Sequence, residues 1–249
     1  MRKDRPVRLE FRLGESLADR AYLIIREQIL KGEISLGSPL SRRQLAESLQ
    51  MSVVPIGEAL QRLEREGFVE ARHRSGTRVR VPTEEEIRDQ YILREALESQ
   101  AARLVAERAT LQQLHELHRM AEQVDVMFSR SYQEQADPQF VFSVHNQHFQ
   151  FHMRIAESAS SEALRNEIET KQVLMFNWLY MVAVPRRKLP LNFHRTLCRA
   201  LETRNPETAD RAMRKHVRYG LEELIAGFQP QESQKWRLNV QDRDRAALL

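Results

Sequence analysis

Histidine side chains are the residues in this sequence that are best suited to bind a metal ion. The chain contains 8 His, and three of them, His145, His148 and His152, fall within one predicted helix, residues 137–158. Since His148 and His152 are four residues apart, their imidazoles project from one helical face, as two ligands of one divalent ion would. The alternative is that such a pair lies at the surface or is hydrogen-bonded within the core.

Two further histidines, His194 and His216, lie on the last two predicted helices. Because the connection between these helices, residues 203–205, is short, we expect them to be antiparallel neighbours. Helical bundles build metal sites from side chains on facing helices, and imidazole nitrogen suits Zn²⁺, Ni²⁺, Cu²⁺ or Fe²⁺. The remaining histidines of this region lack such support, and we expect them to be solvated: His115, His118 and His145.

A metal-dependent enzyme is one alternative for such a cluster, because a metal ion held by histidines can activate water. Against this alternative, no Glu or Asp stands in a zinc-hydrolase motif such as HExxH. The single cysteine, Cys198, cannot form an internal disulfide, which is typical of a protein from a reducing compartment.

Length and composition favour a helical globular protein. The chain has 249 residues, enough for one large domain or two modest ones at about 150 residues per domain. Hydrophobic residues make up 41% and charged residues 30%. The longest apolar stretch, residues 173–184, is interrupted by Asn177 and is too short for a membrane span. The basic N-terminus lacks the apolar segment of a secretory signal, so we expect a cytoplasmic protein with no membrane partner.

The excess of positive charge lies in the first third of the chain. Residues 1–82 contain 16 Lys and Arg against 11 Asp and Glu, a balance of +5, whereas residues 83–249 contain 23 against 24, a balance of −1. A basic N-terminal part joined to a nearly neutral part favours contact with a polyanion such as DNA. A solvated basic face is the alternative.

The first third has the element order of a winged helix-turn-helix. Ser16 is a candidate N-cap for a helix that ends at residues 31–32, and Ser41 has capping-box spacing to Gln44. Ser52 begins a third helix, with a proline in its first turn, that ends at Gly67. Residues 68–71 and 77–81 then resemble two short strands of a hairpin.

In a helix-turn-helix the second helix of the motif enters the major groove, while hydroxyl groups and arginines contact phosphates. The third helix and the hairpin tip therefore carry most of the predicted DNA contacts. The alternative is a structural hairpin with a solvated arginine surface. The predicted contacts to double-stranded DNA are Ser41, Arg43, Ser52, Val53, Val54, Arg62, His73 and Gly76.

From Thr83 onward almost everything is predicted to be helical. Thr83 and Glu86 have capping-box spacing, and Ser, Thr, Asp, Asn or Pro residues mark the later helix starts. The expected helices span residues 83–108, 110–129, 137–158, 161–182, 190–203 and 206–228. The sequence thus predicts a mainly α protein with three parts: a winged helix-turn-helix (1–82), an all-α bundle (83–228) and a polar C-terminal tail (229–249).

The first part resembles the DNA-binding domain of GntR-family bacterial transcription regulators. Residues 36–81 carry the matching motifs, among them Ser52-x-x-Pro55-x-x-Glu58-Ala59-Leu60 and the wing sequence Gly76-Thr77-x-Val79. The resemblance implies operator binding by a homodimer. In this family, arginines usually stand where this chain has Val53 and Gly57. Because an Arg–guanine pair contributes about 1–3 kcal/mol of discrimination, we expect an operator unlike the common one, or weak DNA binding.

The second part resembles the all-helical effector domain of the FadR subgroup, the FCD type. Its landmarks here are residues 94–98, Phe151-His152, His194-Arg195 and residues 212–216. In this subgroup the metal ligands are an Asp or Asn four residues before the Phe-His histidine, that histidine, and two later ones. The resemblance therefore implies a divalent transition metal, with Zn or Ni favoured. The implied ligands are His148, His152, His194 and His216, with His148 standing where Asp is common.

The same resemblance suggests an effector site. Arg94 corresponds to the first effector-domain helix and could clamp a carboxylate, or could instead form a surface pair with Glu98. Asn177 is a polar residue on an otherwise apolar helix and could face the same cavity, or instead form a hydrogen bond with the backbone of a neighbouring element. We therefore expect a homodimeric, ligand-responsive regulator whose effector is a small organic acid. The alternatives are a regulator with a structural metal and no effector, and the metal-dependent enzyme.

Overall fold

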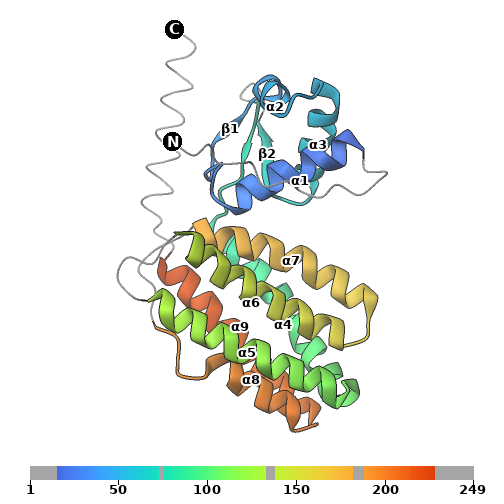
Figure 1. The fold of residues 1–249 in the computed structure, drawn as a ribbon, viewed down its shortest axis with the longest axis vertical. Coiled ribbons are helices and arrows are strands. Elements are labelled where there is room, and N and C mark those ends of the chain that lie inside the picture. Colours follow the sequence, from blue (N-terminus) through green and yellow to red (C-terminus); the bar gives the residue numbers. More distant parts are fainter. Residues whose placement is uncertain (1–15, 73–75, 133–137, 182–187, 228–249) are drawn as a thin grey trace, which may run out of the picture. The chain divides into compact units, whose positions relative to one another are not determined.

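The computed structural model describes residues 16–72, 76–132, 138–181 and 188–227. The chain forms two compact units, Met1–Arg80 and Val81–Leu249. Figure 1 shows a small unit of helices and short strands and a larger unit made of helices. The predicted fold class, a winged helix-turn-helix followed by an all-α bundle, is confirmed.

Three helices and a small sheet make up the first unit. The helices are α1 (Leu17–Leu30), α2 (Arg42–Leu49) and α3 (Val53–Arg65). Ser16 caps α1 with a full capping box, and the Ser41 hydroxyl accepts the Gln44 N–H at 3.3 Å at the start of α2. Gly67 follows α3 with a φ of 79°, the left-handed conformation in which glycine commonly ends helices.

The sheet of this unit has the strand order β1-β3-β2, and both pairs are antiparallel. Its strands are β1 (Pro39–Leu40), β2 (Val69–Arg72) and β3 (Gly76–Val79). The hairpin β2–β3 was expected, but β1 was not, because two residues give no periodic signal. Pairing of β1 with β3 ties the chain before α2 to the wing.

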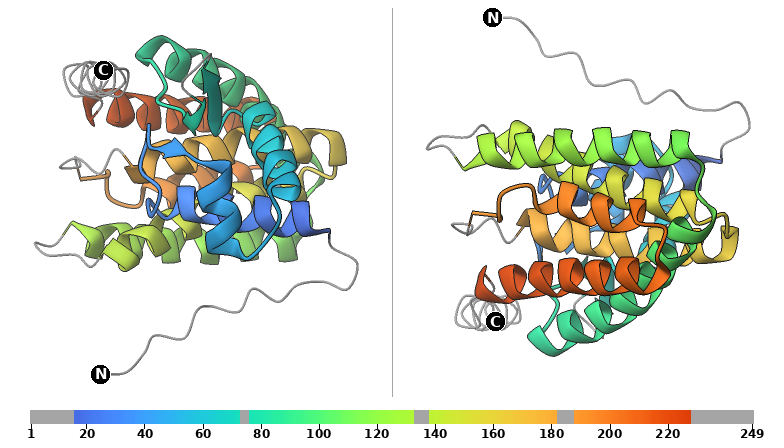
Figure 2. Two further views of the ribbon diagram at one scale, coloured as in Figure 1. Left: turned by 90° about the horizontal axis from the view of Figure 1, so that it is seen from above. Right: turned by 90° about the horizontal axis from the view of Figure 1, so that it is seen from below.

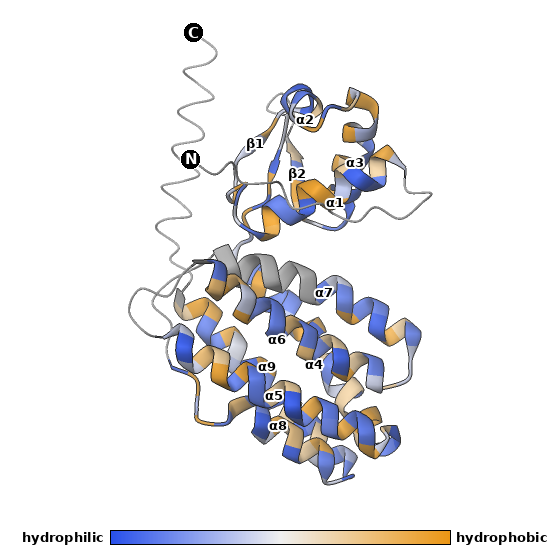
Figure 3. Cartoon of the chain, viewed as in Figure 1, coloured by the Kyte–Doolittle hydropathy of each residue, from blue (hydrophilic) through white to orange (hydrophobic). Residues whose placement is uncertain are grey.

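Six long helices occupy the described part of the second unit. They are α4 (Glu84–Arg108), α5 (Leu111–Ser131), α6 (Pro138–Ser158), α7 (Glu162–Met181), α8 (Phe193–Glu202) and α9 (Pro206–Gly227). Figure 2 shows most of them running side by side, and α4 packs along α9 while α5 packs on α6 and α8. Figure 3 shows hydrophobic and hydrophilic patches on several of these helices, among them α5 and α8.

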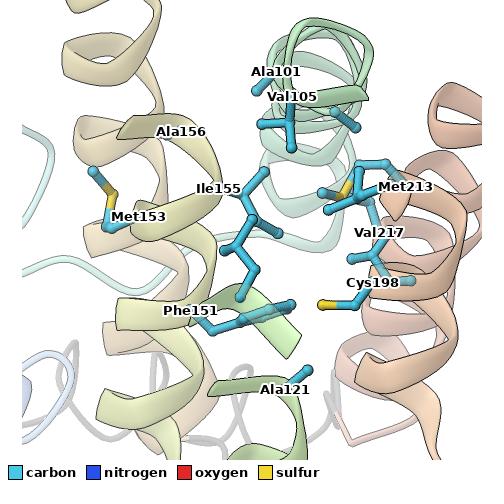
Figure 4. Close-up of a cluster of buried hydrophobic side chains, with 14 of the residues drawn as sticks. Ala101, Val105, Ala121, Phe151, Met153, Ile155, Ala156, Cys198, Met213 and Val217 are labelled. Carbon is cyan, nitrogen blue, oxygen red and sulfur yellow. The ribbon is translucent and has the colours of Figure 1, made fainter. Parts of the chain in front are cut away.

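The core of the bundle lies where α4, α6, α8 and α9 meet. Phe151 and Ile155 of α6 point toward Cys198 of α8 and toward Met213 and Val217 of α9, and all of these side chains are almost fully buried (Figure 4). The core therefore fixes α6, α8 and α9, the helices that carry the predicted metal ligands.

One helix start differs from its expected position. The helix expected from residue 190 begins at Phe193, because Asn192 has a φ of 59° and the left-handed conformation stops the helix from extending backward. The C-terminal tail, 229–249, lies outside the described residues. Among the described residues, no helix combines the length and the apolar character needed to cross a bilayer.

Candidate functional site

Four histidines from three helices converge in the second unit. The Nε2 atom of His152 on α6 lies 2.9 Å from Nε2 of His148 and 3.1 Å from Nε2 of His216 on α9. The ring of His194 on α8 lies 4.8 Å from the ring of His148 and 5.1 Å from that of His216, centroid to centroid. The structure thus brings the four predicted ligand side chains into one cluster.

A buried carboxylate and a partly buried one orient two of these rings. Glu98 on α4 accepts a hydrogen bond from Nδ1–H of His152 at 2.5 Å, and Asp125 on α5 accepts one from Nδ1–H of His194 at 2.8 Å. Since an ionised carboxylate only accepts, Nδ1 carries the proton in both rings and Nε2 keeps its lone pair. Metal-binding histidines in proteins have this kind of carboxylate partner.

The environment favours the neutral form of three of these histidines. Burial, and then the charge of neighbouring histidines, lowers the pKa of His148 and His216 well below the usual value of 6.5. Burial also lowers the pKa of His194, although Asp125 opposes this. Neutral imidazole is the form that coordinates a metal.

Two ring nitrogens in the cluster, Nε2 of His194 and Nδ1 of His216, are buried without a hydrogen-bond partner among the described residues. Nε2 of His194 is inaccessible and forms no hydrogen bond, while its Nδ1 is held by Asp125. Since a buried acceptor without a partner is costly, an ion at this place would satisfy it. One nitrogen each of His148, His194 and His216 lies within 4.8 Å of the others, so the cluster has the donor set and the spacing for one transition-metal ion.

Arg94 is buried, and it is paired within the protein. Its side chain is 4% exposed and donates from Nε to Glu98, whose side chain is 3% exposed. The Arg94–Glu98 ion pair, which the sequence offered as an alternative, therefore forms, but it lies in the core and not at the surface. Burial alone would raise the pKa of Glu98, but Arg94 and His152 outweigh it and lower that pKa to about 2.

The expectation for His145 was wrong. It is 3% exposed and lies edge-on to the ring of Phe128, with centroids 5.7 Å apart, because position 145 falls on the inner face of α6. His115 is exposed, as expected, whereas His118 is partly buried and contacts Glu202 at 2.8 Å. The side chain of Asn177 lies outside the described residues.

The start of α3 presents apolar side chains to solvent. Val53 and Val54 are 52% and 65% exposed, and the residue before them, Ser52, is exposed as well. Ser41 is exposed at the start of α2. The Arg43 side chain is 89% exposed, with Nε only 3.7 Å from the carboxylate of Glu47. These residues remain predicted DNA contacts.

Arg62 is held within the first unit. Its guanidinium lies over the ring of Tyr22, 3.7 Å from the centroid, and contacts Asp19 at 3.3 Å and Glu66 at 3.2 Å. These partners give Arg62 a role in packing α3 on α1; its side chain is still 45% exposed, and it remains a predicted DNA contact. At the wing, Gly76 is exposed with a φ of 75°, and His73 lies outside the described residues.

Comparisons with known proteins identify both units. Residues 17–79 match the model of the bacterial regulatory proteins of the gntR family, and residues 89–219, over half of the chain, match the FCD domain. The chain belongs to the GntR family and carries an FCD domain. Its family members are transcription regulators and not enzymes.

Several GntR-type relatives cover most of the chain. The probable D-xylose utilization operon transcriptional repressor of Paenarthrobacter nicotinovorans is 29% identical over 81% of this chain and 86% of its own length. The HTH-type transcriptional repressor RspR of Escherichia coli K12 is 26% identical over 79% of this chain and 83% of its own.

Two solved structures share the GntR/FCD fold. One is McbR/YncC of E. coli, with a TM-score of 0.68 and 22% identity over 86% of this chain and all of that one. The other is a GntR-type regulator from Rhodococcus sp. RHA1, with a TM-score of 0.69 and 20% identity over the same shares.

Nothing in the sequence indicated that Asp125 contacts His194 in this GntR-family protein, or that Glu98 contacts His152. Glu98 was visible only as a helical neighbour of Arg94, and its bond to His152 depends on packing of α4 against α6. Asp125 gave no signal, because only the contact of α5 with α8 brings it to His194.

Proposed function

We propose that this transcription regulator binds one divalent transition-metal ion through His148, His152, His194 and His216. Zn and Ni are the favoured metals. The convergence of the four rings, two of them oriented by carboxylates, is the observation that carries the proposal. Bound metal would stabilise the helices that carry the ligands, because binding to the folded state adds to its stability.

The spacing of the nitrogens supports one shared ion. Nε2 of His152 lies 2.9 Å from Nε2 of His148 and 3.1 Å from Nε2 of His216, which is close enough for all three nitrogens to bind one ion. Without an ion, the same separations are those of imidazole hydrogen bonds, so metal content decides between the two.

Metal content after purification without added metal tests the site. His152→Ala and His216→Ala should each lose the ion and lower the melting temperature. His145→Ala is the matched control, since it also removes a buried imidazole from α6 and should lower the melting temperature while keeping the metal. A metal-free wild type from metal-replete medium would end the proposal.

The effector, we further propose, is a small carboxylate that binds at the metal. The buried pair Arg94–Glu98 and the partly exposed pair Arg195–Asp125 each have no net charge, and burial disfavours the charged form of His148, His194 and His216, so the charge of a bound ion stays uncompensated. An anionic ligand would offset that charge. Arg94 and Asn177 remain the proposed effector contacts, with Arg94 sharing its remaining N–H groups between Glu98 and the ligand.

Thermal stabilisation by a panel of organic acids tests this effector class. The hit should need both bound metal and Arg94, and its neutral amide should not stabilise the protein. If metal is present but no acid shifts the melting temperature or changes DNA binding, the alternative of a structural metal without an effector is favoured.

For DNA binding, we propose that residues 1–82 contact the operator and that residues 83–228 sense the effector and form a homodimer. A two-fold dimer would match a palindromic operator. Affinity for DNA should fall steeply with salt, because neutralised phosphates release counterions. Arg43→Ala should weaken binding to all sequences, whereas Arg199→Ala, which removes an exposed arginine of α8, should not. Binding by residues 83–249 alone would refute the assignment, and the mass in solution tests the dimer.

A further inference from the structure

A cavity lies beside the histidine cluster. It has a volume of about 450 Å³ and is formed by the C-terminal half of α5 and the segment that leads into α8. None of the four clustered histidines lines it. The residues that line it include Asp125, Phe128, Tyr132, Lys188, Leu189 and Arg195.

The walls combine positive charge with apolar surface. Lys188 is exposed at the cavity, and the Arg195 side chain is 27% exposed. Phe128 and Leu189 form part of the apolar wall, and the Tyr132 hydroxyl accepts the Leu189 N–H at 3.2 Å, which fixes the chain there. With two cations and the single carboxylate of Asp125, the lining carries a net charge of +1.

Asp125 joins this cavity to the cluster. Its carboxylate accepts from the backbone N–H groups of His194 and Arg195 at 3.0 Å and 3.2 Å, and so caps α8 in place of the Asn192 side chain. The same carboxylate also accepts from Nε–H of Arg195 at 3.3 Å and from Nδ1–H of His194. Phe128, which lines the cavity, stacks on the ring of His194 with centroids 5.6 Å apart.

We propose that this cavity is a second ligand site, which binds a small carboxylate with an apolar body through Lys188 and Arg195. The anion competes with Asp125 for the Arg195 guanidinium, and the change in Asp125 alters the orientation of His194. Carboxylate binding here therefore changes the metal affinity of the cluster. This second step rests on the proposed metal site, whereas binding in the cavity does not.

Calorimetric titration of the full-length, metal-stripped protein with benzoate tests the binding step, with benzyl alcohol as the neutral probe of similar shape. Benzoate should bind and benzyl alcohol should not. Lys188→Glu should weaken benzoate binding about fivefold or more, because it reverses a charge at the cavity. Arg199→Glu makes the same charge change on exposed α8 surface outside the lining and should leave binding unchanged.

His148→Ala separates the two sites, because His148 does not line the cavity. Benzoate binding should persist in this variant. If His148→Ala does not bind benzoate, or if only Zn²⁺-loaded protein binds it, the anion binds at the histidine cluster. Either result would overturn the second site but would leave the proposed effector site at the metal intact. Binding that Lys188→Glu does not change, or no binding of benzoate, would also overturn it.

Competition with a Zn²⁺-chelating dye, with and without saturating benzoate, tests the coupling. The Zn²⁺ affinity should change by the same factor by which Zn²⁺ changes benzoate affinity, and Lys188→Glu should remove the effect. An unchanged Zn²⁺ affinity would overturn the coupling. If the protein takes up no Zn²⁺ at all, the proposed metal site and the coupling fail, and benzoate binding to the metal-free protein still decides the cavity.

Discussion

Replacing Glu98 with Gln should destabilise the bundle strongly. The substitution keeps the shape of the side chain but removes a charge that is paired with buried Arg94 and bonded to Nδ1–H of His152. A buried cation that loses its partner costs about 3–5 kcal/mol. With about 2–4 °C per kcal/mol for a unit of this size, the melting temperature should fall by roughly 6–20 °C.

The pKa of Glu98 leads to a similar magnitude. It is lowered from 4.5 to about 2, so ionised Glu98 stabilises the folded state above pH 4.5, and this contribution is lost as the pH falls toward 2. A difference of that size corresponds to about 3 kcal/mol. In Glu98→Gln this acid-dependent part of the stability should be absent.

Tryptophan fluorescence during thermal unfolding is the assay, because both tryptophans, Trp178 and Trp236, belong to residues 81–249. Glu95→Gln is the matched control on the same helix, since Glu95 pairs with Arg214 and Arg218 nearer the surface and should cost at most about 1 kcal/mol.

A second variant tests whether the loss comes from the unpaired charge of Arg94. Adding Arg94→Met to Glu98→Gln removes both charges and should recover part of the loss. The metal affinity of Glu98→Gln should also fall about 10–100-fold, because His152 loses its charged partner. If Glu98→Gln costs no more than Glu95→Gln, the argument for a charged pair in the core is refuted.

Three other predictions concern DNA, pH and the cavity. Val53→Arg with Gly57→Arg should shift operator preference toward that of other GntR proteins, as measured by selection of bound sequences; a Cβ at position 57 meets nothing within 4 Å, so the fold should tolerate the change. The stability of the metal-free protein should fall as the pH drops below about 6.5, because burial keeps His148 and His216 neutral and protonation then favours the unfolded state; melting curves from pH 8 to pH 5 measure this. Asp125→Asn should weaken metal binding and lower the melting temperature, whereas full metal affinity in this variant would show that His194 needs no charged partner.

Most of the fold could be predicted because helix ends are encoded locally. Thr83 and Thr110 form capping boxes with Glu86 and Gln113, and the observed helices α4 and α5 begin immediately after these threonines. Such signals involve neighbours three residues apart, so they need no knowledge of tertiary structure. The strand β1 was missed because its identity depends on pairing with a segment almost 40 residues later, Pro39 with Arg78.

The candidate site could be predicted less completely, for the same physical reason. The spacing of His148 and His152 is local and therefore visible in the sequence. Burial of His145 and the roles of Glu98 and Asp125 depend on which helices pack together, which the sequence alone does not show. Ligand candidates are thus easier to recognise than the carboxylates that orient them.

If the second unit senses an effector as proposed, the position of Glu98 bears on how that effector would act on DNA binding. It lies on α4, the helix that begins at Glu84, soon after β3 ends at Val79, so α4 is the covalent continuation of the winged helix-turn-helix. A ligand at the metal that changes the bond between Glu98 and His152 acts directly on this helix. Such a ligand affects DNA binding only if it binds two arrangements of α4 with different affinity. Glu98→Gln, which weakens the link between the cluster and α4, should therefore reduce the effect of the effector on operator affinity more than Glu95→Gln does.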